Sequence, residues 1–285
     1  MSQNRNINNL KTGLYCVSTP IGNMGDFSTR AKEILQKSDL ILCEDTRVSK
    51  KLFDRYSIRK KYISYHKFNE RKKMKEIIDH LLEKKIVSII SDAGTPLISD
   101  PGKILINECI KNNIDIYPVP GPSAVTTALS ISGFSDNYYF CGFLPPKIGE
   151  IKKMFKSLLS INCSIVFFVS PKKIKKYVPI LIEFFEEREI LICREMTKIH
   201  EEYLRLEVKS LLNLKLVEKG ELTIVISEKK EDKKTSQTLS ESDKRNIKVM
   251  INKLSTKEIT ELISQNSKVS KKEIYDYCLK LKNEK

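Results

Sequence analysis

Four loops rich in proline, glycine or acidic residues follow short apolar runs in the first half of the chain. These loops span residues 19–26, 44–47, 91–102 and 120–124. The apolar runs, such as residues 86–90, have the length and composition of buried strands. Segments with apolar residues at helical spacing, such as Ala31, Ile34 and Leu35, lie between them. Strands that alternate with helices predict an α/β domain built on a mostly parallel sheet.

The position of the four loops predicts a ligand crevice. In an open α/β sheet, ligands bind outside the carboxyl ends of the strands. The loop at 91–102 holds two glycines, two prolines and two aspartates. Proline restricts the backbone, and glycine lets it approach a ligand closely. A single loop of this kind fits a structural turn equally well, but four of them at one sheet edge favour a binding site.

The second half of the chain repeats the α/β pattern and then changes. Strand patterns recur from residue 138 to residue 227, with alternation that favours antiparallel pairing. A polar stretch without periodicity follows, and then three short helical patterns. These helices fit either a helix-turn-helix unit or a plain packing or dimerisation module. We predict a disordered N-terminus at 1–11, α/β domains at 12–132 and 133–228, a linker at 229–243 and a helical tail at 244–285.

Composition narrows the function classes. Lys and Arg number 51 against 36 acids, a net charge of +15, which favours an anionic partner and nucleic acid first. No apolar run is long enough to span a membrane, and the N-terminal residues lack the apolar core of a signal peptide, so we expect a cytoplasmic protein without membrane contact. Seven scattered cysteines and three histidines predict neither disulfides nor a metal site. Phosphate-cradling and dinucleotide-binding glycine motifs are also missing.

Taken together, the motifs resemble those of the tetrapyrrole-methylase superfamily. The resemblance rests on residues 19–23, 44–47, 91–96, 100–102, 120–124, 142–145, 194–198, 220–222 and 271–275, which occur in the family's order. Within the superfamily, the chain is most similar to members that methylate the ribose of a cytidine in 16S ribosomal RNA. Where the family usually has a glutamate, this chain has Val169, and residues 147–150 depart from the family's basic stretch.

This resemblance implies a fold, a cofactor and partners. The fold is an α/β, two-domain tetrapyrrole-methylase-like fold with the active cleft between the domains, here with a small C-terminal helical unit. The cofactor is S-adenosylmethionine, and the implied partners are 16S rRNA in the small ribosomal subunit and a second copy of the chain in a homodimer. The acceptor would approach over residues 19–23. The cofactor-binding residues implied are Pro20, Asp92, Ala93, Gly94, Thr95, Pro96, Asp100, Pro120, Gly121, Ser123, Ala124 and Glu221.

Transfer of a methyl group to a ribose hydroxyl also requires a group that removes the hydroxyl proton. The candidates are Glu44, Asp45, Glu195 and Lys198. For Glu44 and Asp45 the alternative is a structural role, as a helix cap and as the partner of Arg47. Two other functions stay open on these residues: a small-molecule, tetrapyrrole-type methylase on the same fold, and a non-catalytic RNA-binding protein of ribosome assembly.

Overall fold

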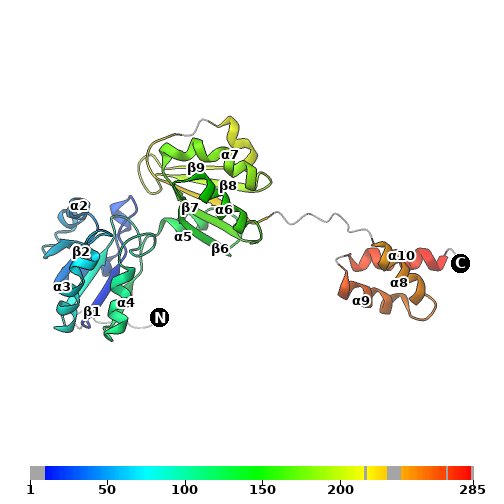
Figure 1. The fold of residues 1–285 in the computed structure, drawn as a ribbon, viewed down its shortest axis with the longest axis horizontal. Coiled ribbons are helices and arrows are strands. Elements are labelled where there is room, and N and C mark those ends of the chain that lie inside the picture. Colours follow the sequence, from blue (N-terminus) through cyan, green and yellow to red (C-terminus); the bar gives the residue numbers. More distant parts are fainter. Residues whose placement is uncertain (1–9, 215–216, 230–238, 268, 284–285) are drawn as a thin grey trace. The chain divides into compact units, whose positions relative to one another are not determined.

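The computed structural model describes residues 10–214, 217–229, 239–267 and 269–283, and the chain divides into two compact units, Met1–Lys229 and Lys230–Lys285 (Figure 1). The first unit holds two α/β layers and the second holds three helices. The predicted disordered N-terminus, 1–11, and the predicted linker, 229–243, fall largely outside the described residues.

The first sheet has five strands, all parallel. Their order is β3 (Tyr62–Ser64), β2 (Leu40–Cys43), β4 (Ile86–Ile90), β1 (Gly13–Val17) and β5 (Ile116–Val119). Because the strands run in one direction, the loops after all five of them lie along one edge of the sheet. The four loops that the sequence marks are therefore brought together at that edge.

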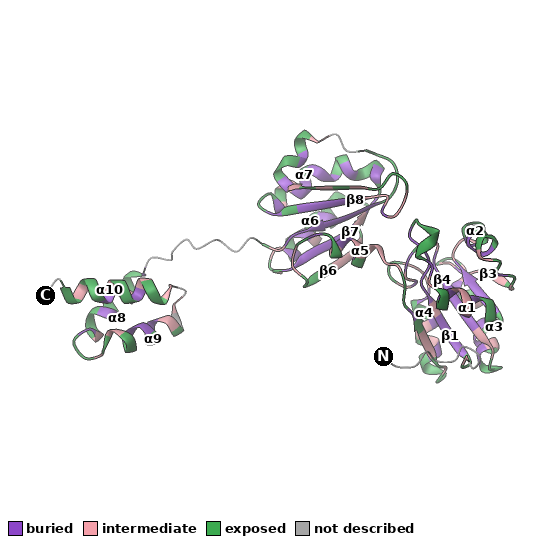
Figure 2. Ribbon diagram, turned by 180° about the vertical axis from the view of Figure 1, so that it is seen from behind, coloured by how far each residue is buried: buried purple, intermediate pink, exposed green. Residues whose placement is uncertain are grey.

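Helices cover both faces of this sheet, and successive residues of a strand face opposite sides. Tyr15 and Val17 pack with the first pair of helices, α1 (Thr29–Lys37) and α2 (Thr46–Tyr56). Leu14 packs with the second pair, α3 (Glu70–Leu82) and α4 (Lys103–Lys111). Figure 2 shows the strands buried and the outer sides of the helices exposed.

The second sheet is mixed. Its order is β6 (Tyr138–Phe143), β7 (Ser164–Val169), β10 (Leu222–Ile226), β8 (Glu189–Arg194) and β9 (Glu202–Glu207), with β6 and β7 parallel and the other pairs antiparallel. On one face lie α6 (Ile148–Leu158), α7 (Ile174–Phe185) and the 3₁₀ helix Val208–Asn213. The antiparallel pairing predicted for this half of the chain is confirmed.

Helix α5 (Ala124–Ser130) covers the other face of the second sheet. Its Val125 and Ala128 pack with Val166 and Val225, although α5 lies within the range predicted for the first domain. Ile21, from the loop after β1, belongs to the same apolar cluster. The two α/β layers therefore share a packed junction directly beside the strand-end loops.

Local structure differs in several places from what the sequence pattern suggests. Residues 63–70 have the composition of a strand, but β3 ends at Ser64, because Asn69 accepts a hydrogen bond from the His66 N–H and donates one to the Ser64 carbonyl, which closes a turn. Two helices were not predicted: α2, which Asp45 caps, and α6, which begins at Ile148, shortly after the 142–145 motif. The predicted linker ends too late, because Ser240 already caps α8.

Three helices form the C-terminal unit: α8 (Glu241–Met250), α9 (Thr256–Asn266) and α10 (Lys271–Asn283). They enclose an apolar core of their own that includes Ile247, Ile259 and Ile274. Ser255 and Glu258 form a capping box at the start of α9. Within the described part of the chain, no helix combines the length and apolar character needed to cross a membrane.

Candidate active site

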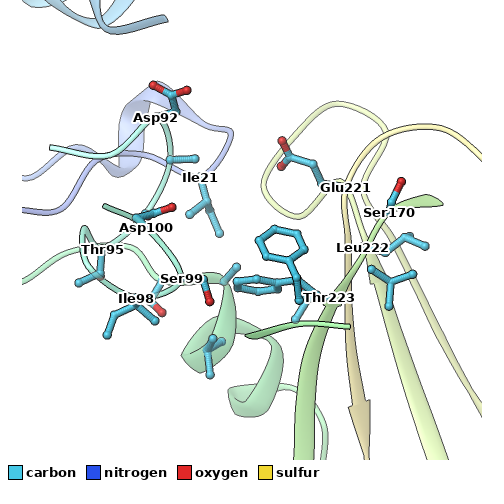
Figure 3. A pocket seen from close by; sticks show the side chains of 18 of the residues that line it. Ile21, Asp92, Thr95, Ile98, Ser99, Asp100, Ser170, Glu221, Leu222 and Thr223 are labelled. Carbon is cyan, nitrogen blue, oxygen red and sulfur yellow. The ribbon is translucent and has the colours of Figure 1, made fainter. Parts of the chain in front are cut away.

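A cavity of about 440 Å³ opens between the strand-end loops of the first sheet and the ends of β7 and β10 in the second (Figure 3). Asp92, Thr95 and Asp100 line it from the loop after β4, and Ser170, Leu222 and Thr223 face them from the second sheet. Phe143 and Phe168 add an aromatic wall, with ring centroids 5.2 Å apart. The cavity thus has Asp92 and Asp100 on one side, and on the other an aromatic and apolar wall that also contains Ser170, Thr223 and Glu221.

Hydrogen bonds connect three of the predicted loops around this cavity. Thr19 and Gly94 exchange two backbone hydrogen bonds, of 2.8 and 3.1 Å, which join the loop after β1 to the loop after β4. The Thr95 hydroxyl donates to the Pro122 carbonyl at 3.1 Å, which adds the loop after β5. Gly94 has a φ of +83°, a left-handed conformation that strains residues with a side chain. The predicted loops therefore form one rigid wall.

Three acids from two of these loops line the cavity: Glu44, Asp92 and Asp100. Burial, together with the negative charges of Asp100 and Asp92, raises the pKa of Glu44 to about 7. Burial is also the main cause that raises the pKa of Asp100, to about 6, and that of Asp92. Buried acids that repel one another bind protons or cations readily, so this side of the cavity suits a positively charged ligand or proton transfer.

A second cavity, of about 380 Å³, adjoins the first. The two share Ile21, Asp92, Ala93 and Glu221 as a common wall. Its other lining residues come from the loop after β1, from α2 and from the end of β4, and Lys198 lines it as well. Two ligands that occupied the two cavities would therefore meet at this wall.

Asp45 has a structural role. It caps α2 by accepting the Arg47 N–H at 2.8 Å, and it forms an ion pair of 2.6 Å with the Arg47 side chain. These hydrogen bonds hold its pKa at about 2, so Asp45 is a poor proton acceptor at neutral pH. The alternative interpretation of Asp45 as a cap and ion-pair partner fits the structure, whereas Glu44 faces the first cavity.

Glu195 and Lys198 lie at the rim, on the loop after β8. Lys198 forms ion pairs with Glu195 at 2.9 Å and with Glu221 at 3.1 Å. Glu195 also accepts the Glu221 N–H at 2.8 Å. Burial opposes ionisation of Glu195, but these hydrogen bonds outweigh it and lower its pKa, while the two acids raise the pKa of Lys198 against its own burial. Both side chains stay charged at neutral pH.

The predicted cofactor-binding residues divide among three cavities. The first cavity contains Asp92, Ala93, Gly94, Thr95, Asp100, Ser123, Ala124 and Glu221. Pro20 lines the second cavity, and a third, more open cavity of about 820 Å³ contains Pro96, Pro120 and Gly121 together with Thr95 and Ser123. Phe168, Ser170 and Thr223, which belong to the wall that the second sheet contributes, were not among the predicted site residues. The motifs at 142–145 and 220–222 pointed to that side, through Phe143, Glu221 and Leu222.

Comparisons with known proteins agree with this geometry. A family model described as Tetrapyrrole (Corrin/Porphyrin) Methylases matches residues 13–212. A relative from Mesomycoplasma conjunctivae is 46% identical over 223 residues, which cover 76% of this chain and 93% of the relative. A relative from Neisseria meningitidis is 36% identical and covers 95% of this chain and 94% of its own length. A relative from Thermotoga maritima is 43% identical over 76% of this chain and 98% of its own length. All three are named Ribosomal RNA small subunit methyltransferase I.

The fold has a counterpart among solved structures. A crystal structure of diphthine synthase superposes with a TM-score of 0.60 at 13% sequence identity, covering 75% of this chain and 89% of that one. At this identity the likeness concerns the fold. The family model spans the first α/β layer, the first-sheet loops that line the first two cavities, and the second layer as far as residue 212, so that β10 lies outside it. The chain therefore belongs to the tetrapyrrole (corrin/porphyrin) methylase family.

Proposed function

We propose that this chain is an S-adenosylmethionine-dependent methyltransferase that modifies small-subunit ribosomal RNA, with the 2′-hydroxyl of a cytidine ribose in 16S rRNA as the acceptor. Its relatives, which carry the name of that class of enzyme, support the substrate. The structural observation that carries the proposal is the pair of adjoining cavities with a common wall at Ile21, Asp92, Ala93 and Glu221. One cavity would hold the donor and the other the acceptor.

The residues of the first cavity fit S-adenosylmethionine. A volume of about 440 Å³ lies within the range of cavities that bury small ligands. The donor carries a methyl group on a cationic sulfonium, together with an ammonium and an adenine ring. Asp92 and Asp100 offer carboxylates to positive charge, and Phe143 and Phe168 offer ring faces to a base. When bound, the cofactor supplies the methyl group for an in-line displacement, in which positioning supplies much of the rate.

Glu44 is the residue that we propose as the general base. Of the four candidates, Asp45 holds its proton too weakly, and Glu195 and Lys198 neutralise each other. Glu44 has a pKa of about 7, which suits a base that works near neutral pH. Its carboxylate would accept the proton of the attacking hydroxyl. Asp92, which lies on the wall common to both cavities, would hold the acceptor near Glu44.

The second cavity suits a nucleotide. Its lining combines apolar groups such as Met24 and Leu52 with the cation of Lys51 and with Lys198, which is ion-paired with Glu195 and Glu221. A ribose with its flanking phosphates needs hydrogen-bonding groups and positive charge, and lysine is a common ligand of phosphate. The backbone of residues 19–22, which lines the same cavity, is where the resemblance places the acceptor.

Donor and acceptor assays test the proposal. Purified protein is incubated with methyl-labelled S-adenosylmethionine and either 30S subunits or naked 16S rRNA, and any 2′-O-methyl group is mapped. We expect one labelled cytidine. Donor binding without RNA labelling would favour the small-molecule methylase, and the absence of donor binding would leave the RNA-binding alternative. Glu44→Gln in the same assay tests the base, because its donor affinity should be retained while turnover is lost.

The homodimer is part of the same proposal and rests on the resemblance to the family. Sedimentation equilibrium of the purified chain tests it, with twice the 32.9 kDa mass as the expected result. A monomer at assay concentration would contradict it without affecting the proposed chemistry.

A further inference from the structure

The positive charge of the chain is concentrated in one segment. Residues 47–75 contain twelve lysines and arginines against two acids, a formal surplus of ten, in a chain whose total net charge is +15. This segment, which we call the basic rim, comprises α2, β3 and the first turns of α3. Asp54 pairs with Arg59, and the carboxylate of Glu70 is buried against the backbone N–H of Gly102. Most of the positive charge therefore faces solvent without compensation.

Two parts of the basic rim lie beside the candidate active site, whereas Arg59, Lys60 and Lys61 precede β3 and lie at the opposite edge of the sheet. Helix α2 and the turn before α3 follow the carboxyl ends of β2 and β3, at the sheet edge that carries the two cavities. Val48 and Lys51 of α2 line the second cavity, and Arg55 lies one turn further along the same face of the helix. Among the described residues, no carboxylate lies within ion-pair distance of Lys51, Arg55, Lys67 or Arg71. The positive charges of Lys51 and Arg55 thus extend along α2 away from the proposed acceptor cavity.

An exposed aromatic ring lies in the turn before α3, between Lys67 and Arg71 in the sequence. Phe68 is 94% exposed, although a phenylalanine in a folded chain is normally buried. The turn that carries it is well ordered by hydrogen bonds: the His66 N–H donates to the Asn69 side chain at 2.8 Å, and the Phe68 N–H donates to the His66 ring at 3.3 Å. The His66 and Phe68 rings meet edge to face, with centroids 6.0 Å apart. The backbone thus presents the ring to solvent in a fixed position.

We propose that the basic rim is a docking surface for single-stranded RNA, in which an unpaired base stacks on Phe68 while Lys51, Arg55, Lys67 and Arg71 contact the phosphates. The inference rests on the proposed function and deepens it, since it concerns how the RNA is recognised beside the acceptor cavity. Proteins that bind single strands combine a positively charged path for the backbone with aromatic rings for the bases. Bases in a duplex are already stacked on each other, so an exposed ring selects unpaired RNA. A protein partner would instead require a larger apolar surface around Phe68.

Tryptophan fluorescence can report the stacking directly, because the chain contains no tryptophan. Phe68→Trp places one indole in the turn, and Leu212→Trp places one at a similarly exposed apolar site, 67% exposed, in the 3₁₀ helix Val208–Asn213. Both variants are titrated with a single-stranded RNA of about 12 nucleotides and with a duplex of the same length. We expect the single strand to quench Trp fluorescence in the Phe68→Trp variant and leave it unchanged in the Leu212→Trp variant. Equal quenching of both variants, no quenching, or equal quenching by the duplex would overturn the proposal.

Affinity gives a second readout. Phe68→Ala should weaken binding of the same single strand about five- to hundredfold, because stacking on an aromatic side chain contributes that much per base. Phe68→Tyr should bind like the native chain, and Leu212→Ala is the control. The affinity for S-adenosylmethionine should not change in any of these variants, because Phe68 and Leu212 lie outside both cavities. Unchanged RNA affinity in Phe68→Ala would refute the role of the ring.

The outcome can be separated from that of the proposed function. The fluorescence and affinity measurements need neither donor nor methyl transfer. If the native chain methylates 16S rRNA while Phe68→Ala binds RNA normally, the docking surface fails and the enzyme assignment stands. If no methyl transfer occurs but single-stranded RNA still quenches the Phe68→Trp variant, the docking surface stands and the enzyme assignment fails. Quenching by ribosomal proteins free of RNA, with no effect of free single-stranded RNA, would assign Phe68 to a protein partner and overturn the proposal.

Discussion

Two strands of this protein are followed directly by a glutamate, and the two glutamates behave in opposite ways. Glu44 follows β2 in the first sheet, and Glu195 follows β8 in the second. Burial and the neighbouring acids Asp100 and Asp92 raise the pKa of Glu44 to about 7. Hydrogen bonds from Lys198 and from the Glu221 N–H overcome the burial of Glu195 and lower its pKa.

The contrast arises from neighbours that are distant in the sequence. Asp92 and Asp100 reach Glu44 because β4 lies next to β2 in the parallel sheet. Glu195 meets Glu221 because β8 pairs with β10, so that Arg194 lies opposite Leu222. The first arrangement leaves a carboxyl group that can exchange a proton near neutral pH, and the second fixes a carboxylate in an ion pair. The same residue type at the end of a strand can therefore serve either catalysis or structure.

The largest expected effect comes from removing the exchangeable carboxyl group. Glu44→Gln should lower kcat for RNA methylation by about 10²- to 10⁴-fold, the usual contribution of a general base. Glu195→Gln is the matched control and should reduce kcat far less. The measurement is the initial rate of labelling of 30S subunits at saturating donor. Equal loss in both variants would contradict the division of roles between the two glutamates.

The pH dependence should follow Glu44 as well. Because a base must be deprotonated, activity of the native enzyme should rise with pH through about 7, the pKa of Glu44. The rise should be missing from the residual activity of Glu44→Gln. A native profile that is flat between pH 6 and pH 8 would argue against Glu44 as the base, with these pH limits set about one unit either side of that pKa.

A second large effect is expected at the loop that borders Glu44. Gly94 has a φ of +83°, and a Cβ there would lie 3.3 Å from the Ile21 side chain and 3.7 Å from the Pro122 carbonyl. Gly94→Val should cost about 1–2 kcal/mol in backbone strain and displace the wall of the donor cavity. We expect donor affinity to fall about 100-fold, equivalent to about 2.7 kcal/mol, by calorimetric titration.

Gly220, which lies against Glu195, provides the comparison with Gly94. Gly220 has a φ of +89°, and a Cβ there would lie 2.6 Å from the Glu195 carboxyl group. Gly220→Ala should disturb the contact between Glu195 and Glu221, and its effect on the donor should be smaller than that of Gly94→Val. A normal donor affinity in Gly94→Val would remove the loop after β4 from the proposed donor site.

The edge of the first sheet could be predicted from the sequence, because each strand and the loop after it lie in one continuous stretch of residues. An apolar run followed by glycine, proline and aspartate, as at 86–102, contains all the information needed to place a strand and a loop. The first cavity also needs Phe168 and Leu222, which face it only because β7 pairs with β10. Pairing between distant strands sets that wall, and no local pattern encodes it. For the same reason the sequence identifies four candidate general bases but does not show which of them has a pKa suited to that role.

Stability should respond to pH with opposite signs at the two glutamates. The folded state raises the pKa of Glu44 from 4.5 to about 7, so it binds more protons than the unfolded chain between these values. The contribution of Glu44 to stability is therefore lost as pH rises from about 4.5 to about 7. Glu195 has a lowered pKa, so its contribution is present above 4.5 and lost as pH falls. Thermal unfolding of Glu44→Gln and Glu195→Gln, followed from about pH 8 down to well below 4.5, should show these opposite trends relative to the native chain.

The smallest expected effect tests whether Lys198 alone is responsible for the lower pKa of Glu195 relative to Glu44. Lys198→Met removes the cation 2.9 Å from Glu195 and leaves the Glu221 N–H in place. Burial would then act on Glu195 with less opposition, so its pKa should rise, as measured by carboxyl-carbon NMR titration. Stability should change by less than about 1 kcal/mol, because partly exposed ion pairs contribute little. Lys209→Met, which breaks the exposed pair with Glu207, is the control and should leave Glu195 unchanged. A pKa of Glu195 that stays low would mean that the backbone of β10, rather than the cation, keeps this glutamate ionised.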